Sequence, residues 1–457
     1  MTISQLVQSQ KEFFATQQTK DISFRKACLQ RLKKELIKRE DDILKALHND
    51  FKKSEYEGVM TETGIVLSEL KMTIKKLNSW AKPERVTPSL LNFPSSAKIY
   101  KEPYGRVLIV APWNYPYQLA LAPLIGAVAA GNTVILKPSE LTPHTSKVTR
   151  EIIETVFDKN HVAVVEGGVE VSQELLARRW DYIFFTGSVK VGKIVAKAAA
   201  EYMTPVTLEL GGKNPCVIDK TANIKLAAKR LVWGKFINAG QTCIAPDYWL
   251  IHKSIKEKFV EVFKAELYNA YGDDPQASKD YPRIVNTRNF DRLASLLENE
   301  KFIIGGKVDR EDCYISPTLV DEPSLDSEVM KDEIFGPISP VISYADESEI
   351  DTIISKYEKP LALYVFTTRN DFAKKIIQKH SFGGGTINDT TVHFANHRLP
   401  FGGVGESGIG GYHGKRTFDT FSHKKGVVKR YNWLDITTRY APYKGKMKML
   451  RTLMKFG

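Results

Sequence analysis

Short runs of β-branched and aromatic residues alternate along the chain with longer stretches of helical periodicity. Between residues 101 and 212 the runs are RVLIV, NTVILK, HVAVVEGG, DYIFFTGS and PVTLELGG, and helical patterns separate them. Buried apolar strands that alternate with helices are typical of a parallel sheet covered on both faces. This region therefore predicts an α/β lobe, and the Lys- and Glu-rich pattern of residues 3–80 predicts amphipathic helices packed on the body.

A second alternating series begins near residue 222. It predicts the strands YWLIH, ISPVISYA, ALYVFTT and GGGTIND, and helices over residues 222–238, 254–270, 347–357 and 370–380. Two Rossmann-like α/β lobes are the simplest fold that explains both series. The longest apolar run, residues 119–131, is interrupted by Pro and Gly and is shorter than a membrane span, so it predicts a buried helix.

The net charge of +13 is concentrated at the carboxyl end of the chain. From Lys424 to Gly457 there are ten Lys or Arg residues and a single acidic residue, Asp435. The surplus of nine leaves only +4 (13 − 9) for the other 423 residues. A basic tail on a nearly neutral body lacks the patterned basic face of a nucleic-acid-binding protein, so we expect no nucleic-acid partner.

Cysteine usage and the amino terminus indicate the compartment. Cys28, Cys216, Cys243 and Cys313 lie far apart in the sequence, without a paired Cys-x-x-Cys spacing. This spacing argues against a zinc site and against a disulfide framework. The first twenty residues lack the apolar core of a signal peptide. We therefore expect no bound metal, reduced thiols and a cytoplasmic location.

Glycine and polar residues follow one predicted strand at its carboxyl end, which is where open α/β sheets bind ligands. Thr186, Gly187 and Ser188 end this strand, and a helix is entered near Gly192. Free backbone N–H groups at a helix start suit a pyrophosphate. The spacing differs from the usual dinucleotide motif, and an ordinary βα turn explains it equally well.

Side chains with suitable chemistry also stand at three other strand ends. In LKPSELTP, Lys137 can hydrogen-bond ribose hydroxyls and Glu140 would repel a 2′-phosphate, whereas the alternative is a surface turn fixed by Pro138. In APWNYP, Asn114 offers an amide donor for a developing oxyanion. In LELGGKNP, Glu209 is either a general base or an ordinary helix-cap or ion-pair carboxylate.

Cys243 lies in FINAGQTCIAPDYWL, directly after a predicted helix. A cysteine taken by itself is more often a small apolar filler than a nucleophile, and its surroundings decide its reactivity. Together with the residues above, however, it completes one set. A thiolate, an oxyanion donor, a carboxylate base and a dinucleotide site are the parts needed to oxidise an aldehyde to an acid.

The sequence also resembles the aldehyde dehydrogenase superfamily over essentially its whole length. Seven motifs carry this resemblance, in the chain order APWNYP, LKPSE, FTGSVKVG, LELGGKNP, NAGQTC, EIFGP and LPFGGVGESG. The short amino terminus, the Trp-Asn-Tyr-Pro form and the stretch YHGKRTFDTFSHKK are most similar to the class 3 branch, which handles fatty and aromatic aldehydes. Ile244 departs from the wider family, and its apolar side chain suits an apolar substrate.

The resemblance implies a covalent mechanism that ends in hydrolysis. Cys243 attacks the aldehyde carbon to give a thiohemiacetal, whose oxyanion is held by Asn114 and by the backbone N–H of Cys243. Hydride then leaves for the nicotinamide, and Glu209 activates the water that hydrolyses the acyl thioester. Superfamily members that pass the acyl group to coenzyme A generally lack this carboxylate.

The resemblance implies NAD as the cofactor, with NADP as the alternative. Lys137 and Glu333 resemble the ribose-binding residues, Ser188 resembles a pyrophosphate contact, and Phe335 borders the nicotinamide ribose. The other residues expected to bind the cofactor are Trp113, Glu140, Thr186, Gly187, Gly192 and Gly211.

We therefore expect a cofactor-binding domain, a catalytic domain and a small bridging β element for oligomerisation. Residues 1–81 and 101–208 are assigned to the NAD-binding domain and residues 209–390 to the catalytic domain. The Pro- and Ser-rich connecting segment 82–100 and residues 391–439 are expected to bridge to the second subunit of a homodimer.

Residues 440–457 form a basic tail with an apolar stripe on a helix begun near Lys446. The residues of the stripe are Met447, Leu450, Leu453 and Met454. Such a helix either lies at a membrane interface, as a peripheral contact at the inner membrane surface, or docks on the protein's own body.

Two other functions explain parts of the sequence. A cysteine hydrolase or esterase would keep Cys243 and Glu209 beside a vestigial nucleotide site, and reduced cofactor appearing with substrate would exclude it. A membrane-surface scaffold would use the basic tail but would leave the seven motifs unexplained.

Overall fold

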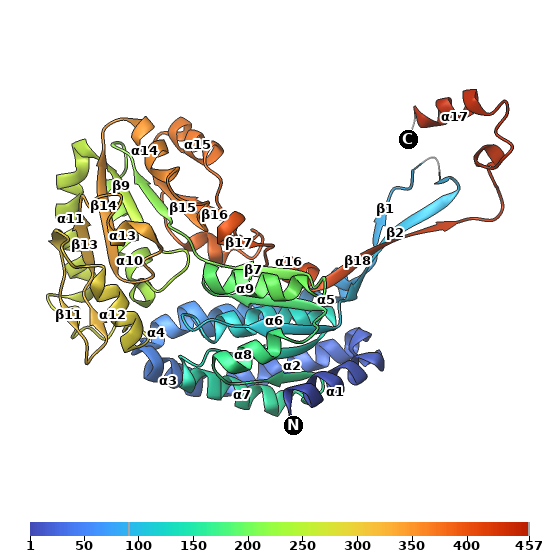
Figure 1. Ribbon diagram of the computed structural model, residues 1–457, viewed down its shortest axis with the longest axis horizontal. Coiled ribbons are helices and arrows are strands. Elements are labelled where there is room, and N and C mark those ends of the chain that lie inside the picture. Colours follow the sequence, from blue (N-terminus) through green and yellow to red (C-terminus); the bar gives the residue numbers. More distant parts are fainter. Residues whose placement is uncertain (90–91, 456–457) are drawn as a thin grey trace.

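The computed structural model describes residues 1–89 and 92–455, with Leu453 described by its backbone alone. Two α/β lobes lie next to each other, and a narrow arm extends away from them (Figure 1). The expected pair of α/β lobes is thereby confirmed. Leu90 and Leu91 of the predicted connecting segment, and Phe456 and Gly457 of the predicted tail, lie outside the described residues.

The first lobe is built on a sheet that has six strands among the described residues. All neighbouring pairs are parallel except β17 with β7. From β3 the chain adds β4 and β5 on one side of the sheet, and it then crosses back to add β6 and β7 on the other side. The carboxyl ends of β3 and β6 therefore flank a crevice of the kind that binds ligands. In sheet order the strands are β17 (Gly408–Ile409), β7 (Val206–Glu209), β6 (Tyr182–Thr186), β3 (Arg106–Val110), β4 (Thr133–Lys137) and β5 (Val162–Val164).

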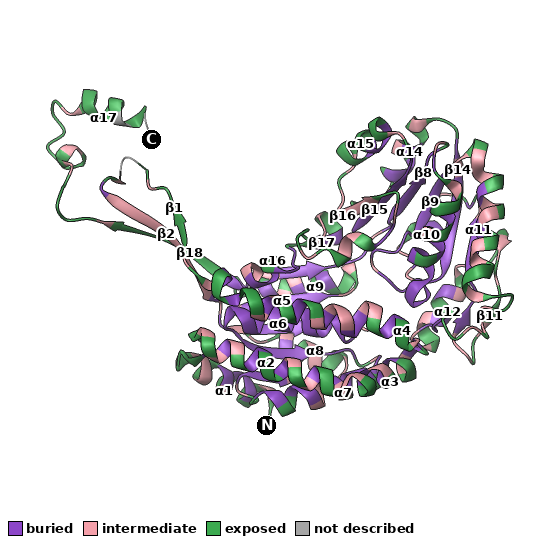
Figure 2. Cartoon of the chain, turned by 180° about the vertical axis from the view of Figure 1, so that it is seen from behind, coloured by how far each residue is buried: buried purple, intermediate pink, exposed green. Residues whose placement is uncertain are grey.

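Helices cover both faces of this sheet and exclude water from its strands (Figure 2). The predicted helix over residues 119–131 is α6, which is buried along its whole length and packs between the sheet and the outer helices. The helices of this lobe are α1 (Ile3–Ala15), α2 (Ile22–Lys38), α3 (Glu40–Phe51), α4 (Glu55–Gly58), α5 (Gly64–Ala81), α6 (Gln118–Ala130), α7 (Pro143–Val156), α8 (Val169–Leu176) and α9 (Val189–Ala200).

The second lobe contains a seven-stranded sheet within the described ranges. It is parallel apart from the edge strand β10. In sheet order the strands are β10 (Phe302–Ile304), β13 (Thr318–Asp321), β14 (Ile338–Tyr344), β9 (Tyr248–His252), β8 (Pro215–Ile218), β15 (Ala362–Phe366) and β16 (Gly384–Ile387). The helices are α10 (Ile224–Phe236), α11 (Lys256–Tyr271), α12 (Thr287–Ser295), α13 (Glu328–Lys331), α14 (Glu347–Ile354) and α15 (Asn370–Lys379), and β11 (Val308–Asp309) with β12 (Tyr314–Ile315) forms a small ribbon.

The arm is a three-stranded antiparallel sheet with β2 in its centre. Its strands are β1 (Glu84–Val86), β2 (Ser95–Pro103) and β18 (Ser422–Arg430). Residues 82–100 were expected to form a connecting segment within a bridging β element, and the structure places β1 and most of β2 there. Both faces of the arm meet solvent, so its strands lack the alternation of apolar and polar residues that identifies a half-buried strand.

The expected bridging segment 391–439 is only partly in the arm. Its strand β17 pairs with β7 in the first lobe, and α16 (Lys415–Thr420) packs against α6 before the chain enters β18. The tail then forms α17 (Met447–Met454), close to the predicted start at Lys446. This helix lies beyond the tip of the arm (Figure 1). In the structure it therefore does not dock on the lobes of its own chain.

Candidate active site

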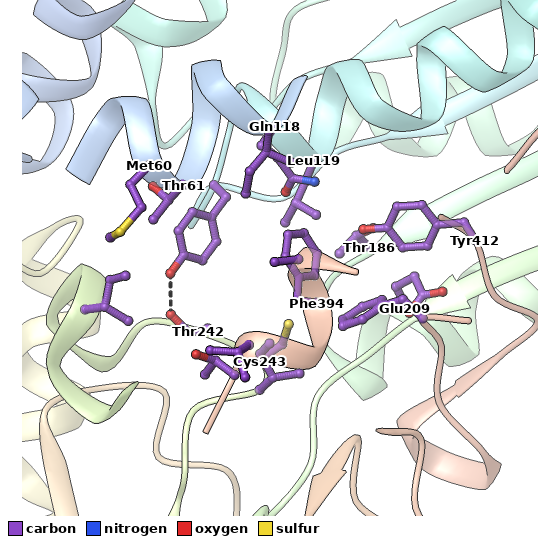
Figure 3. Close-up of a pocket in the computed structure, with 18 of the residues that line it drawn as sticks. Met60, Thr61, Gln118, Leu119, Thr186, Glu209, Thr242, Cys243, Phe394 and Tyr412 are labelled. Carbon is purple, nitrogen blue, oxygen red and sulfur yellow. Dashed lines mark hydrogen bonds between the residues drawn. The ribbon is translucent and has the colours of Figure 1, made fainter. Parts of the chain in front are cut away.

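A cavity of about 170 Å³ lies between the two lobes and contains Cys243 and Glu209 in its wall. Figure 3 looks into this cavity. Cys243 and Thr242 lie on one side, Met60 and Thr61 with Gln118 and Leu119 lie across from them, and Glu209, Thr186 and Tyr412 close one end. Most of the remaining wall is apolar: Ile65, Leu210, Trp233, Ile237, Ile244, Val392, Phe394 and Phe401.

The loop between α10 and β9, residues 237–247, carries Cys243 and is held from several directions. Asn238 and Ala239 both adopt left-handed backbone angles, with φ of 54° and 52°, which is uncommon for residues other than glycine. The Asn214 amide donates hydrogen bonds to the carbonyls of Cys243 and Ala245 at 2.7 and 3.0 Å. We call residues 237–247 the nucleophile loop.

The Cys243 thiol is half-buried and is surrounded by groups that keep it protonated. Burial raises its pKa above the ordinary value, and the negative charges of Glu333 and Glu209 raise it further. The backbone N–H groups of Cys243 and Ile244 act in the opposite direction. The thiol is therefore neutral at neutral pH, and a base must accept its proton as it attacks.

Glu209 ends β7, beside Thr186 at the end of β6. Its side chain is 2% exposed, and no described residue gives either carboxylate oxygen a hydrogen bond. Burial raises its pKa well above the ordinary value, with Arg416 opposing the shift. A helix-cap or ion-pair carboxylate would have a partner, so this geometry favours the general-base alternative.

Asn114 lies against the nucleophile loop. Its side-chain amide donates to the carbonyl of Gln241 at 3.0 Å, and its own carbonyl accepts from the Asn238 amide at 2.8 Å. A side-chain amide has two N–H donors, so the second can serve an oxyanion. The residue is buried beside the cavity and does not form part of its described lining.

The crevice at the ends of β3 and β6 fits a dinucleotide. Ser188 caps α9, so the start of that helix faces the crevice with free N–H groups. The buried Thr186 hydroxyl has no hydrogen-bond partner among the described residues. Gly187 follows at the strand end, whereas Gly192 serves packing: a Cβ there would lie 2.7 Å from Leu210, so this glycine lets α9 approach the sheet.

The other predicted cofactor residues converge from both lobes. The Trp113 and Phe335 rings meet edge to face, 5.2 Å between centroids. The Glu333 carboxylate lies directly over Gly211, where a Cβ would be 1.9 Å from Oε2, so a larger residue there would displace the carboxylate. Burial raises the pKa of Glu333 to about 8, helped by the negative charge of Asp247.

The Lys137 ammonium lies at the carboxyl end of β4, where the sequence predicted it. It is almost fully enclosed and pairs with Glu140, whose side chain remains 43% exposed. Lys137, Thr186 and Ser188 thus lie at strand ends of the first lobe, and the unpartnered Thr186 hydroxyl there suits a ligand with ribose hydroxyls and phosphates.

Sequence reasoning missed several residues of this site. The Tyr115 hydroxyl and the Thr242 hydroxyl share a hydrogen bond of 2.6 Å, drawn as the dashed line in Figure 3. Met60 and Thr61 enter the wall from a π-helical turn, residues 59–63. Tyr115 lies in the motif APWNYP and Asn214 in the motif LELGGKNP, and these positions are the only sequence signal for them. Met60 and Thr61 belong to a helical region with no distinguishing pattern.

Comparisons with known proteins agree over nearly the whole chain. The family model described as "Aldehyde dehydrogenase family" matches residues 1–427. The 4,4′-diaponeurosporen-aldehyde dehydrogenase of Staphylococcus aureus is 49% identical over 455 residues, which is 99% of each chain. A dog protein named "Aldehyde dehydrogenase, dimeric NADP-preferring" is 42% identical over 447 residues, 97% of this chain and 99% of its own.

A solved structure gives the same result. The substrate-bound state of Staphylococcus aureus AldH superposes with a TM-score of 0.98 at 48% identity, over 99% of this chain and all of the other. The likeness extends through both lobes and the arm.

Proposed function

The chain belongs to the aldehyde dehydrogenase family, within its class 3 branch, and from this premise we propose how its residues carry out the reaction. It is an NAD(P)-dependent enzyme that oxidises an aldehyde to a carboxylic acid. The observation that carries the assignment of residues is that Cys243 and Glu209, from different lobes, line the same cavity.

Cys243 is the nucleophile. As its sulfur bonds to the aldehyde carbon, its proton leaves to a base, and the carbonyl oxygen becomes an oxyanion. The second N–H of the Asn114 amide and the backbone N–H of Cys243 stabilise that charge. The bound nicotinamide supplies the hydride acceptor that turns the thiohemiacetal into a thioester.

Glu209 is the base for hydrolysis. Its unpartnered oxygens are free to accept a proton from a water that attacks the thioester carbon. A carboxylate whose pKa is raised by burial holds that proton more strongly than an exposed one would. The carboxylic acid then leaves and the Cys243 thiol is restored.

A dinucleotide cofactor would lie across the first-lobe crevice. We assign its pyrophosphate to the α9 start at Ser188 and its ribose groups to Lys137 and Glu333. The Trp113 and Phe335 rings border the nicotinamide end. NAD is the preferred form in this assignment, because Glu140 adds an exposed negative charge where a 2′-phosphate would lie.

The substrate is an apolar aldehyde, either aliphatic of medium to long chain or aromatic. The cavity wall supports this, since aliphatic and aromatic side chains dominate it and Ile244 lies directly after the nucleophile. Burying apolar substrate surface supplies binding energy of about 25 cal/mol per Å². An aldehyde with a charged tail would lose hydration there without gaining a partner.

The active form is a homodimer joined through the arm. The three-stranded arm sheet has exposed edges and projects from the lobes, and the dog relative is named as dimeric. Exposed strand edges pair readily with a second chain.

Among the described residues no helix has the length and apolar character to cross a bilayer. The tail helix α17 instead supports a peripheral contact with an anionic membrane surface.

A panel of aldehydes tests the reaction and the substrate together. Each aldehyde is incubated with the full chain and either NAD or NADP, and reduced cofactor is measured by its absorbance. Reduction that rises with aliphatic chain length, with stoichiometric acid formed, is the expected result. Acid formed from a thioester without any cofactor reduction would favour the hydrolase instead.

A further inference from the structure

Three ionisable side chains are buried behind the pocket wall of the first lobe. Lys53 and Glu62 are fully enclosed and form an ion pair of 3.0 Å. Glu57 lies nearby with 6% of its surface exposed. Removing an ion from water costs on the order of several kcal/mol, and the attraction within an ion pair offsets this cost only when the geometry is good. Three such groups in one place therefore call for a structural reason.

Glu62 fixes the segment that follows Asn114. Its second oxygen accepts hydrogen bonds from the backbone N–H groups of Tyr117 and Gln118, at 3.0 and 2.9 Å. These groups begin α6, where a negative charge is favourable. The carboxylate thus anchors the turn between Asn114 and the helix.

Glu57 fixes the nucleophile loop itself. Its Oε1 accepts a hydrogen bond of 2.9 Å from the backbone N–H of Asn238. Asn238 is one of the two residues of the nucleophile loop with left-handed backbone angles. This conformation persists only where neighbouring groups enforce it. The Asn238 side chain in turn donates to the Asn114 carbonyl.

Lys53 connects the two carboxylates. It pairs with Glu62, and its positive charge opposes the effect of burial on Glu57, whose pKa burial raises to about 7. Its ammonium also lies 4.6 Å from the centre of the Tyr115 ring. The Tyr115 hydroxyl binds Thr242, the residue before Cys243, along the dashed line in Figure 3.

A π-helical turn, residues 59–63, lies between Glu57 and Glu62 in the chain. In that turn Met60 and Thr61 line the pocket, whereas Glu62 is fully buried outside the pocket lining. Such turns occur frequently at functional sites.

We propose that Lys53, Glu57 and Glu62, here called the buried bracket, hold the nucleophile loop and the Asn114 segment at the separation that carbon–sulfur bond formation requires. The inference rests on the roles assigned to Cys243 and Asn114 above. The three side chains stand outside the described pocket lining, so they are positioning residues. A displacement of about 1 Å at reacting atoms can cost as much as a hundredfold in rate.

Two substitutions of Glu57 distinguish the position of its hydrogen-bond acceptor from its negative charge. Glu57→Asp keeps the charge beside Lys53 but withdraws the acceptor by one methylene group from Asn238. Glu57→Gln keeps the acceptor in place and removes the charge. The matched control is Glu55→Asp, an exposed position in the same short helix. All are assayed as full-length enzyme, with thermal unfolding to establish that each is folded.

The readout is the rate of cofactor reduction in the first turnover. We expect Glu57→Asp to slow it about tenfold, with the KM for aldehyde and the Kd for cofactor nearly unchanged. Glu57→Gln should stay within about threefold of the unmodified enzyme, and the control should match it. A folded Glu57→Asp enzyme with an unchanged first turnover overturns the proposal. So does a Glu57→Gln enzyme that is slower than Glu57→Asp.

A parallel Cys243→Ser enzyme keeps the two hypotheses apart. If it still oxidises aldehyde, the assignment of the nucleophile fails. If it is inactive while Glu57→Asp is fast, only the buried bracket fails.

Discussion

Glu140 forms an ion pair with Lys137 at the carboxyl end of β4, with 2.5 Å between Oε2 and Nζ. The ammonium is enclosed and the carboxylate is partly exposed, so the pair presents negative charge to the outer edge of the crevice. Lys137 cannot offer its full charge to a 2′-phosphate while Glu140 holds it. This relationship sets the expected preference between the two cofactors.

Replacing Glu140 with Gln should move the preference toward NADP. We expect kcat/KM with NADP to rise about tenfold, equivalent to about 1.4 kcal/mol, and kcat/KM with NAD to change little. Glu154→Gln, a partly exposed carboxylate on α7, is the control. An unmodified enzyme that already prefers NADP would mean that Lys137 dominates and that the 2′-phosphate avoids Glu140.

Cys243→Ser should remove aldehyde oxidation by a factor on the order of a thousand or more, because a serine hydroxyl without a dedicated base is a far weaker nucleophile. Folding and cofactor binding should persist, as measured by thermal unfolding and by fluorescence titration. Cys313→Ser, at a half-buried cysteine outside the cavity, should retain nearly full activity. Substantial turnover by folded Cys243→Ser enzyme contradicts the assignment.

Glu209→Gln should separate the two halves of the reaction. The thioester still forms but its hydrolysis slows by about a hundredfold to ten-thousandfold, the range typical of general bases. Rapid-mixing experiments should then show a burst of reduced cofactor and a slow steady state. Loss of the burst as well would place Glu209 in an earlier step, such as activation of the thiol.

The same residue predicts how activity and stability depend on pH. Glu209 must be ionised to act, and burial raises its pKa, so hydrolysis should increase with pH well above the ordinary carboxylate range. In the unfolded chain the carboxyl ionises at its ordinary pKa. Its contribution to stability is therefore full below that value and is lost as pH rises toward the raised pKa of the folded state.

Glu209→Gln removes this loss, since the amide does not ionise. We expect the substituted enzyme to have a higher Tm than the unmodified one at alkaline pH, with the difference shrinking as pH falls. Calorimetry across pH measures it. A Tm difference that grows on acidification would contradict the raised pKa.

The lobes and the chemical residues could be predicted from the sequence because their signals are local. Each of the five parallel strands of the first lobe is a short apolar run, and Cys243, Glu209 and Lys137 stand in motifs at strand ends or loops. The three-stranded arm was expected from the family resemblance alone, because Ser95 to Pro103 is half-buried along most of its length and has too few apolar residues to mark one buried face. No strand was predicted between residues 272 and 332 either, since the strands there are only two to four residues long.

The buried bracket lay beyond sequence reasoning for a different reason. Lys53, Glu57 and Glu62 stand in a charged helical stretch that predicts a solvated face, and only the tertiary structure encloses them. Their partners Tyr117 and Asn238 are 55 and 181 residues away in the chain. Contacts of that range follow from packing and leave no periodic signal.

The tail helix α17 carries the last prediction. Met447, Leu450 and Met454 are 59%, 39% and 64% exposed, and Lys448 and Arg451 are exposed on the same short helix. An apolar stripe beside cations suits an anionic membrane surface, where each Lys or Arg contributes about 1 kcal/mol near the headgroups.

Deleting residues 442–457 should therefore weaken binding to vesicles that contain phosphatidylserine. Sedimentation with vesicles at low ionic strength measures this, and raising the salt should release the full-length enzyme because the Debye length falls to about 3 Å at 1 M. The matched control replaces Lys448 and Arg451 with Gln, which keeps the apolar stripe and should give intermediate binding. The deletion should also raise the KM for long-chain aldehydes more than for short ones, since long chains partition into the membrane that the tail contacts. Equal vesicle binding by the full-length and truncated enzymes at low salt would exclude the membrane contact and leave α17 to pack on protein, with a second copy of the chain as the available surface.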